Sequence, residues 1–173
     1  AAEIDVQESL DDPESHFETN VIGTERVLEA CRATDTRLGL VGTCMVYDMV
    51  DSEAGIDESH PVKPASPYAG TKLAAENIAE SYYHGYGLPV TILRPFNTYG
   101  PYQKTGMAGG VVSIFTSRDI EAEPLKIFGD GTQTRDLLYV TDCARFIVDG
   151  TFSDAATGEV INAGTGSDIS IND

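Results

Sequence analysis

Tyr68 and Lys72 are the two residues of this sequence whose types and spacing most directly suggest chemistry. They lie in residues 64–76, which read PASPYAGTKLAAE. This segment predicts the start of a helix, because Ser66 is a good N-cap and Pro67 suits the first helical position. A spacing of four residues then places a phenol and an ammonium on one face of that helix.

A phenol beside an ammonium can act as a general base. A free tyrosine titrates near ~10, so base catalysis at neutral pH needs its pKa lowered by about 3 units, roughly 4 kcal/mol of differential interaction. The cation of Lys72 favours the phenolate and is one contributor. Such pairs also occur by chance on helix surfaces, where they contribute only about 0.2–0.5 kcal/mol. The flanking sequence therefore has to decide between a catalytic pair and a chance surface pair.

Thr43 is a third candidate, 25 residues before Tyr68. Residues 37–43 form a short, mostly apolar run that predicts a buried parallel strand with Thr43 at its carboxyl end. Ligands of open α/β sheets bind outside the carboxyl ends of the strands, so a hydroxyl there is well placed for chemistry. A threonine that caps a turn is the alternative interpretation.

The elements around these residues alternate between helix and strand. The pattern predicts a helix over 13–34, a helix from Ser66 that closes at Gly85–Gly87, and strands over 88–94 and 159–162. It also predicts a polar loop over 5–12, a covering loop over 48–65 and a flexible loop over 106–110. An α/β fold with a parallel sheet follows, with no internal repeat.

The region after residue 94 is more irregular. Residues 94–101 predict a loop at the same sheet edge as Thr43, and residues 111–118 predict a short helix. Residues 125–129 and 135–140 are expected to form two strands joined by the Gly-Asp-Gly turn at 129–131. A further helix begins at Thr141 and Asp142.

Five segments together resemble one known family. They are TNVIGT at 19–24, TCMVYD at 43–48, SPYAGTK at 66–72, RPFNTYGP at 94–101 and IFGDGTQTRDLLYVTD at 127–142. In this order they resemble the extended short-chain dehydrogenase/reductase family, the sugar-nucleotide epimerases and dehydratases. The resemblance covers essentially the whole chain, although Asp48 stands where the family usually has glycine. It implies a Rossmann-like parallel sheet with flanking helices, plus part of a small substrate-binding region.

The resemblance also implies a cofactor, a substrate and site residues. The cofactor is NAD, the substrate is a nucleotide-diphosphate sugar, and two long helices form a homodimer interface. The implied catalytic residues are Thr43, Tyr68, Lys72 and Asn20. The implied cofactor contacts are Ala1, Ala2, Asn20, Tyr68, Lys72 and Pro95. The implied substrate contacts are Thr43, Cys44, Met45, Phe96, Asn97, Val111, Phe128 and Arg135.

Within this set the resemblance assigns individual tasks. Lys72 is expected to hold the cofactor ribose and to lower the pKa of Tyr68. Asn20 is expected to order the catalytic groups, and Arg135 is expected to grip the diphosphate. A planar guanidinium suits phosphate oxygens because it can bind them bidentately.

The N-terminal part of the chain lacks one motif of the family. A dinucleotide-binding sheet should begin with a strand and a Gly-rich turn, and no G-x-x-G-x-x-G is present. We therefore expect residues 1–100 to be the C-terminal half of an NAD-binding Rossmann domain. Residues 101–173 are expected to combine a substrate-binding segment with a returning Rossmann strand and helix. The first Rossmann half and the last part of the substrate region are expected to be missing.

Three functions remain open at this point. The 4,6-dehydratases of the family follow their catalytic threonine with Asp-Glu, and Cys44-Met45 stands there instead. Methionine has no exchangeable proton, so C4 epimerisation through a 4-keto intermediate is favoured over 4,6- or 5,6-dehydration. A non-catalytic module that binds a nucleotide sugar or a partner is the third alternative.

Composition excludes other classes. The chain has 173 residues, 28 acidic against 11 basic, and a formal net charge of −17, which argues against nucleic-acid or anionic-membrane partners. No apolar run approaches the roughly 20 residues of a membrane span. Cys31, Cys44 and Cys143 are widely spaced without a His cluster, so neither a disulfide framework nor a metal site is expected. A cytoplasmic protein is expected, and a salt-loaded cytoplasm would suit the acidic surface.

Overall fold

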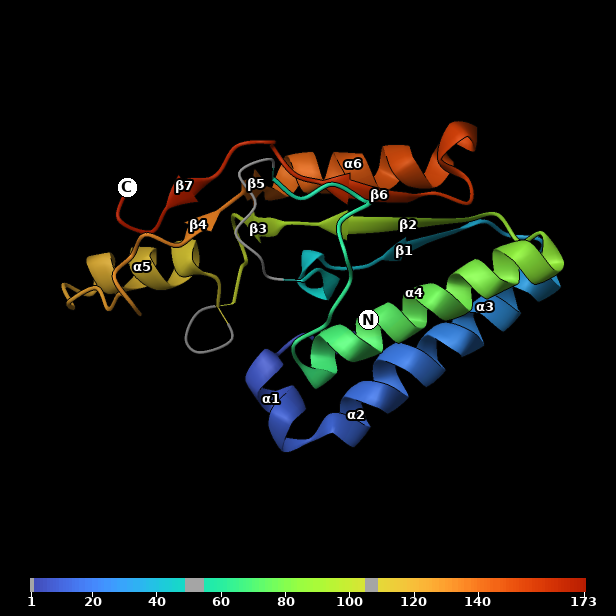
Figure 1. The fold of residues 1–173 in the computed structure, drawn as a ribbon, viewed down its shortest axis with the longest axis horizontal. Coiled ribbons are helices and arrows are strands. Elements are labelled where there is room, and N and C mark those ends of the chain that lie inside the picture. Colours follow the sequence, from blue (N-terminus) through green and yellow to red (C-terminus); the bar gives the residue numbers. More distant parts are fainter. Residues whose placement is uncertain (1, 49–54, 105–108) are drawn as a thin grey trace.

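A three-stranded parallel sheet forms the centre of the computed structural model of this chain, with strands in the order β1-β2-β6. The structure describes residues 2–48, 55–104 and 109–173. In these ranges helices cover both faces of the sheet, α3 and α4 on one and α6 on the other (Figure 1). The layers are those of an α/β fold.

The helices and strands have the following bounds. The helical segments are α1 (Val6–Asp11), α2 (Pro13–Phe17), the π-helical η1 (Glu18–Ile22), α3 (Gly23–Thr34), the 3-10 turn η2 (Cys44–Val46), α4 (Pro67–Tyr86), α5 (Val111–Ile120), α6 (Val140–Phe152) and the 3-10 turn η4 (Asp154–Ala156). The strands are β1 (Leu38–Val41), β2 (Val90–Pro95), β3 (Asn97–Tyr99), β4 (Thr134–Arg135), β5 (Leu137–Tyr139), β6 (Val160–Ala163) and β7 (Ile169–Ser170).

The carboxyl ends of the sheet strands point toward a second, smaller layer of structure. There β3 pairs with β5 in parallel and β4 pairs with β7 in an antiparallel fashion. Figure 1 shows α5, β4 and β7 together at that end, while α3, α4 and α6 run alongside the sheet. The strand ends and the smaller layer therefore meet, as expected where a ligand site forms in an α/β fold.

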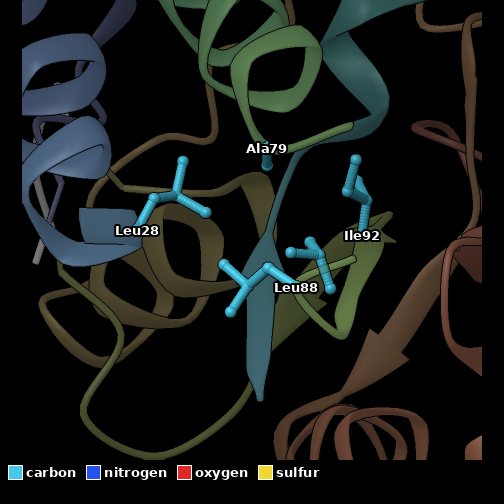
Figure 2. Close-up of a cluster of buried hydrophobic side chains, with 5 residues drawn as sticks. Leu28, Ala79, Leu88 and Ile92 are labelled. Atoms are coloured by element: carbon cyan, nitrogen blue, oxygen red, sulfur yellow. The ribbon is translucent and has the colours of Figure 1, made fainter. Parts of the chain in front are cut away.

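The main core lies between the sheet and the pair α3 and α4. Leu28, Ala79, Leu88 and Ile92 converge there from both helices and from β2 and the turn before it (Figure 2). Leu28 and Ala79 are fully buried. Each large aliphatic side chain removed from water in this way contributes about 1.5–3 kcal/mol.

A buried ion pair joins α4 to the sheet in addition to this core. Arg94 of β2 donates from Nε (3.0 Å) and Nη2 (2.7 Å) to Oε2 of Glu76 on α4. Its Nη1 donates to the hydroxyl of Tyr47 (2.8 Å), which in turn donates to Oδ1 of Asn162 on β6 (2.7 Å). One polar network thus connects the helix that carries Tyr68 to two strands and to the segment after η2.

The α/β class, the parallel sheet and most predicted elements are confirmed. The helix over 13–34 is continuous through α2, η1 and α3, the helix from Ser66 ends at Gly87, and β2 and β6 match the predicted strands within a few residues. Strand β1 is also present, but it is half-buried rather than fully buried. In the described residues it forms one edge of the sheet.

The predicted polar loop over 5–12 is wrong, because α1 occupies most of it. Its acidic residues act as caps: Asp5 accepts from the backbone N–H of Glu8 (3.0 Å) and Asp12 caps α2. Ser9 is buried and donates to the carbonyl of Val6 (2.7 Å). Composition suggested a loop, whereas capping and burial made a short helix.

The predicted strand over 125–129 is also wrong. These residues are exposed and form no strand, since no neighbouring strand is available to pair with them in the described chain. The predicted strand over 135–140 divides into β4 and β5, and Val140 already belongs to α6. The predicted loop over 94–101 contains β3, which pairs with β5 through Asn97 opposite Leu137.

Some predictions fall outside the described residues. These are the cofactor contact Ala1, part of the covering loop (49–54) and part of the flexible loop (106–108). No helix of the described chain is both long and apolar enough to cross a membrane.

Candidate active site

Helix α4 begins as the sequence predicts and places Tyr68 and Lys72 toward the sheet. The hydroxyl of Ser66 accepts from the backbone N–H of Ala69 (3.2 Å), Pro67 occupies the first turn, and Gly87 ends the helix with a positive φ of 70°. Tyr68 and Lys72 are 7% and 8% exposed. The pair is thus buried on one helix face, unlike a chance pair on a surface.

Thr43 completes the group at the end of β1. It is buried, and its Oγ1 accepts from the backbone N–H of Met45 (3.2 Å), which opens η2. A hydrogen bond joins the side chains of Thr43 and Tyr68. Residues separated by 25 positions therefore lie together at the end of the strand.

The pKa values of the pair are governed by burial. Burial raises the pKa of Tyr68 above its ordinary value, the hydrogen bond with Thr43 opposes the rise, and Cys44 and Glu76 add to it. Lys72 is not among the described groups that shift Tyr68, so the predicted lowering by Lys72 is not observed. Its Nζ instead donates to the carbonyl of Val41 (2.6 Å). Burial lowers the pKa of Lys72, and Glu76 opposes this.

Asn20 hydrogen-bonds the segment around Glu3 and the first turns of α4. Its Nδ2 donates to the carbonyl of Glu3 (2.9 Å) and to Oγ1 of Thr71 (3.1 Å), and its Oδ1 accepts from the N–H of Glu3 (3.0 Å). Thr71 in turn donates to the carbonyl of Tyr68 (2.8 Å). Asn20 therefore fastens the segment that contains Ala2 to the first turns of α4.

Four predicted substrate contacts line one cavity of about 320 Å³ in the smaller layer, although they come from separate motifs. These residues are Asn97, Val111, Phe128 and Arg135. The guanidinium of Arg135 donates to the carbonyl of Thr134 (2.7 Å). The lining is mostly apolar, with a few polar groups and cations, as in many ligand pockets.

Cys44 interacts electrostatically with Tyr68 and with Arg135. Burial raises the pKa of its thiol to about 11, and the charges of Arg135 and Asp136 both act on it. Met45, beside it, is 43% exposed. Pro95 and Phe96 follow at the end of β2, where the N–H of Phe96 donates to the carbonyl of Ala163 (2.9 Å). Neither Pro95 nor Phe96 belongs to the cavity lining.

Sequence reasoning missed several residues of this region. Gln103 and Lys126 line the same cavity, and Lys126 lies 4.7 Å from the ring of Phe128. A signal existed for Lys126, because cations are scarce in this acidic chain and this one is close to Arg135 in sequence. No pattern marked the buried pair of Glu76 and Arg94.

We expect Thr43→Val to raise the pKa of Tyr68 further. The substitution keeps the shape of the side chain but deletes the hydrogen bond that favours the phenolate. NMR of [13Cζ]tyrosine, with Tyr68→Phe to assign the signal among eight tyrosines, would measure the midpoint. Thr36→Val, at an exposed turn, is the control and should change nothing. A midpoint that stays or falls in Thr43→Val would contradict the assignment.

Comparison with known proteins agrees with this geometry. Residues 1–164 match the family described as "NAD dependent epimerase/dehydratase family". A UDP-glucose 4-epimerase of Mycolicibacterium smegmatis is 36% identical, with 98% of this chain covering 54% of that protein.

Two solved structures are similar along nearly the whole chain. Pal from Bacillus thuringiensis is 57% identical with a TM-score of 0.96, and the match covers 99% of this chain and 55% of Pal. DesIV, a dTDP-glucose 4,6-dehydratase from Streptomyces venezuelae solved with NAD and TYD bound, is 31% identical with a TM-score of 0.88. The match covers 99% of this chain and 52% of DesIV. The chain spans about half the length of the curated relatives it matches. From its sequence, its fold and the position of its Tyr68 helix, the chain belongs to the NAD-dependent epimerase/dehydratase family.

Proposed function

We propose that this protein oxidises the C4 hydroxyl of the hexose in a nucleotide-diphosphate sugar, with NAD as its cofactor. One observation carries the proposal: Thr43, Tyr68 and Lys72 lie buried together at the carboxyl end of β1, and the chain that leaves the neighbouring β2 lines a cavity that contains Arg135. Membership of the family supports it. We propose that residues 1–100 are the C-terminal half of the NAD-binding Rossmann domain and that residues 101–173 combine a substrate-binding segment with the returning Rossmann strand and helix.

Tyr68 and Thr43 handle the proton of the sugar hydroxyl in this mechanism. The phenolate of Tyr68 takes the proton from the 4-hydroxyl, and the hydroxyl of Thr43 hydrogen-bonds the reacting oxygen. A base placed in this way contributes about 10²–10⁴-fold to the rate. Because burial alone raises the pKa of Tyr68, the phenolate depends on nearby groups that favour it.

The residues present fit a nicotinamide cofactor. Lys72 carries three N–H donors and uses one on the carbonyl of Val41, which leaves donors for ribose hydroxyls at the end of β1. When bound, NAD accepts a hydride from C4 and returns it. Asn20 keeps the segment of Ala2 in place, and we propose that Ala1, Ala2 and Pro95 adjoin the cofactor.

The cavity suits the nucleotide part of the substrate. Arg135 can bind diphosphate oxygens bidentately, and Lys126 adds a second positive charge in a chain that is otherwise strongly acidic. Asn97, Val111 and Phe128 provide the remaining walls that we assign to the nucleotide sugar. Phe96 directly follows β2 and precedes Asn97, which lines the cavity. We propose that Phe96 contacts the sugar.

C4 epimerisation is the overall reaction that we favour. Elimination of water needs one group to remove the C5 proton and another to protonate the departing hydroxyl. The positions that hold Asp-Glu in 4,6-dehydratases hold Cys44 and Met45. Methionine has no proton to give, and a thiol with a pKa of about 11 is not a base at neutral pH. Epimerisation needs neither group.

One observation favours dehydration as the second candidate. Cys44 is a protonated thiol within the electrostatic reach of both Tyr68 and Arg135, so a proton donor does lie in the site. A single donor could protonate a leaving hydroxyl if another group removed the C5 proton. The same experiment separates the two reactions.

The complete enzyme should epimerise its substrate without exchange of carbon-bound protons. UDP- and dTDP-hexoses incubated in deuterated water and followed by NMR should show no deuterium on ring carbons and an intact C6 hydroxymethyl group. Cys44→Ala is the matched variant and should retain turnover. Deuterium with a 6-deoxy-4-keto or 5,6-ene product, abolished in Cys44→Ala, would establish dehydration instead.

Tyr68→Phe should lower turnover of the complete enzyme by about two to four decades. The ring is kept and only the proton acceptor is lost, so substrate affinity should change little. Steady-state kinetics with a calorimetric measurement of substrate binding would separate the two effects. Tyr83→Phe, on the far part of the same helix, is the control. Activity within a few-fold of wild type would remove Tyr68 from the mechanism.

We propose a homodimer through the outer faces of the two long helices, which are the continuous α2–η1–α3 and α4. Apolar side chains are exposed on the first of them, Phe17 in α2, Ile22 in η1 and Val27 in α3, at 48%, 37% and 49%. A second copy of the chain would remove them from water. Val27→Glu should dissociate the dimer in sedimentation velocity experiments, whereas a wild-type protein that is monomeric at micromolar concentration would refute it.

A further inference from the structure

The buried face of α4 continues one turn beyond Lys72. Tyr68, Lys72 and Glu76 follow one another at intervals of four residues and are 7%, 8% and 1% exposed. Residues at this spacing lie on one helix face. The mechanism above uses the first two of these groups and leaves the third, an almost fully buried carboxylate, without a task.

Glu76 is held by only one of its two oxygens. Both donors that Arg94 directs at it, Nε (3.0 Å) and Nη2 (2.7 Å), go to Oε2. Oε1 is buried and has no hydrogen-bond partner in the part of the chain that the structure describes. A buried acceptor that stays unpaired is unfavourable, so a structural anchor for Arg94 alone does not account for this arrangement.

Gly42 shows where the free oxygen lies. A Cβ on Gly42 would overlap Oε1 of Glu76, so Oε1 packs directly against this residue. Gly42 stands between Val41, whose carbonyl accepts from Nζ of Lys72 (2.6 Å), and Thr43, which is hydrogen-bonded to Tyr68. The free oxygen therefore faces the same strand end that both catalytic side chains contact.

We propose that Glu76 is a positioning residue for the reaction, and that its fixed carboxylate keeps the buried Lys72 side chain charged and at the end of β1. This inference rests on the proposed function. It assigns Arg94 the task of holding the carboxylate still, with the hydroxyl of Tyr47 holding Arg94. A glycine is required at position 42 because any side chain there would displace the carboxylate.

The charge of Glu76 agrees in sign with this role at Lys72, whereas at Tyr68 it opposes the phenolate. Burial lowers the pKa of Lys72 and Glu76 raises it. Burial raises the pKa of Tyr68, and Glu76 adds to that rise, as does Cys44. Around Glu76 itself lie Arg94 from β2, Lys72 on the same helix, and Glu80 one turn further along α4. Its negative charge thus favours the protonated forms of both catalytic groups.

Glu76→Gln tests the proposal, since it keeps the shape and removes the charge. NMR of [13Cε]lysine, with only four lysines in this chain and Lys72→Met for assignment, should show the Lys72 midpoint lower by about one pH unit or more. Both limbs of the pH–rate profile of the complete enzyme should shift to lower pH. Glu80→Gln, the same change one turn away, should leave both readouts unchanged.

An unchanged Lys72 midpoint in folded Glu76→Gln would overturn the proposal, even if activity fell. Should Glu76→Gln fail to fold, the wild-type protein provides the test. The [13Cδ] signal of Glu76 should then show a second step at the pH where Lys72 titrates, and Lys72→Met should lack it. Absence of that step in the wild type would also overturn the proposal. Neither NMR readout needs substrate, so both remain valid if the proposed reaction is incorrect.

Discussion

The ion pair between Glu76 and Arg94 is the interaction on which the rest of this structure depends. It joins α4 to β2, and through Tyr47 and Asn162 it reaches η2 and β6. Loss of one partner from a buried pair typically costs about 3–5 kcal/mol, because the other charge is left without compensation. The apolar core between α3, α4 and β2, in which Ala75 and Ala79 are buried, holds the helix against the sheet. The ion pair adds a directional contact from the same helix to β2.

The smaller layer is positioned in a different way. Helix α5 has no buried residue, and the apolar cluster that α6 forms with β5 and β6 is small, built around Leu138, Cys143 and Ala163. Hydrogen bonds take the place of packing there. The carboxylate of Asp136 accepts from the backbone N–H groups of Thr165 and Gly166 (2.8–2.9 Å), and its carbonyl accepts from both nitrogens of Asn97 (3.2 Å).

The contacts of α4 and those of the smaller layer therefore differ in rigidity, which matters for a ligand site between them. Thr43, Tyr68 and Lys72 are held by buried, charged and apolar contacts on rigid elements, and a displacement of an ångström in such a group can be costly to catalysis. The cavity that contains Arg135 is bordered by short strands and by the exposed segment before β4. Loops and short elements of low local stability are commonly where ligand-dependent rearrangement occurs.

The sequence by itself determined the α/β class, the parallel sheet and the long helix from Ser66, because these depend on local signals: caps, hydrophobic period and the spacing of Tyr68 and Lys72. It also contained the motifs in the order of the family, and with them the family assignment.

Tertiary structure alone decided which of these residues meet. Thr43, just after β1, meets Tyr68 only because α4 packs against the sheet, and Asn97 and Arg135 line one cavity only because β3 pairs with β5, which follows Arg135 closely in the chain. The strand expected at 125–129 failed since a strand needs a partner as well as suitable residues. The partnership of Glu76 and Arg94 lies between residues 18 positions apart on different elements, where no periodicity could reveal it. Electrostatics were decided in the same way. Proximity on a helix predicted that Lys72 would lower the pKa of Tyr68, but Lys72 is not among the described groups that shift Tyr68, and burial raises this pKa. Desolvation depends on all the atoms around a group and not on its neighbours in sequence.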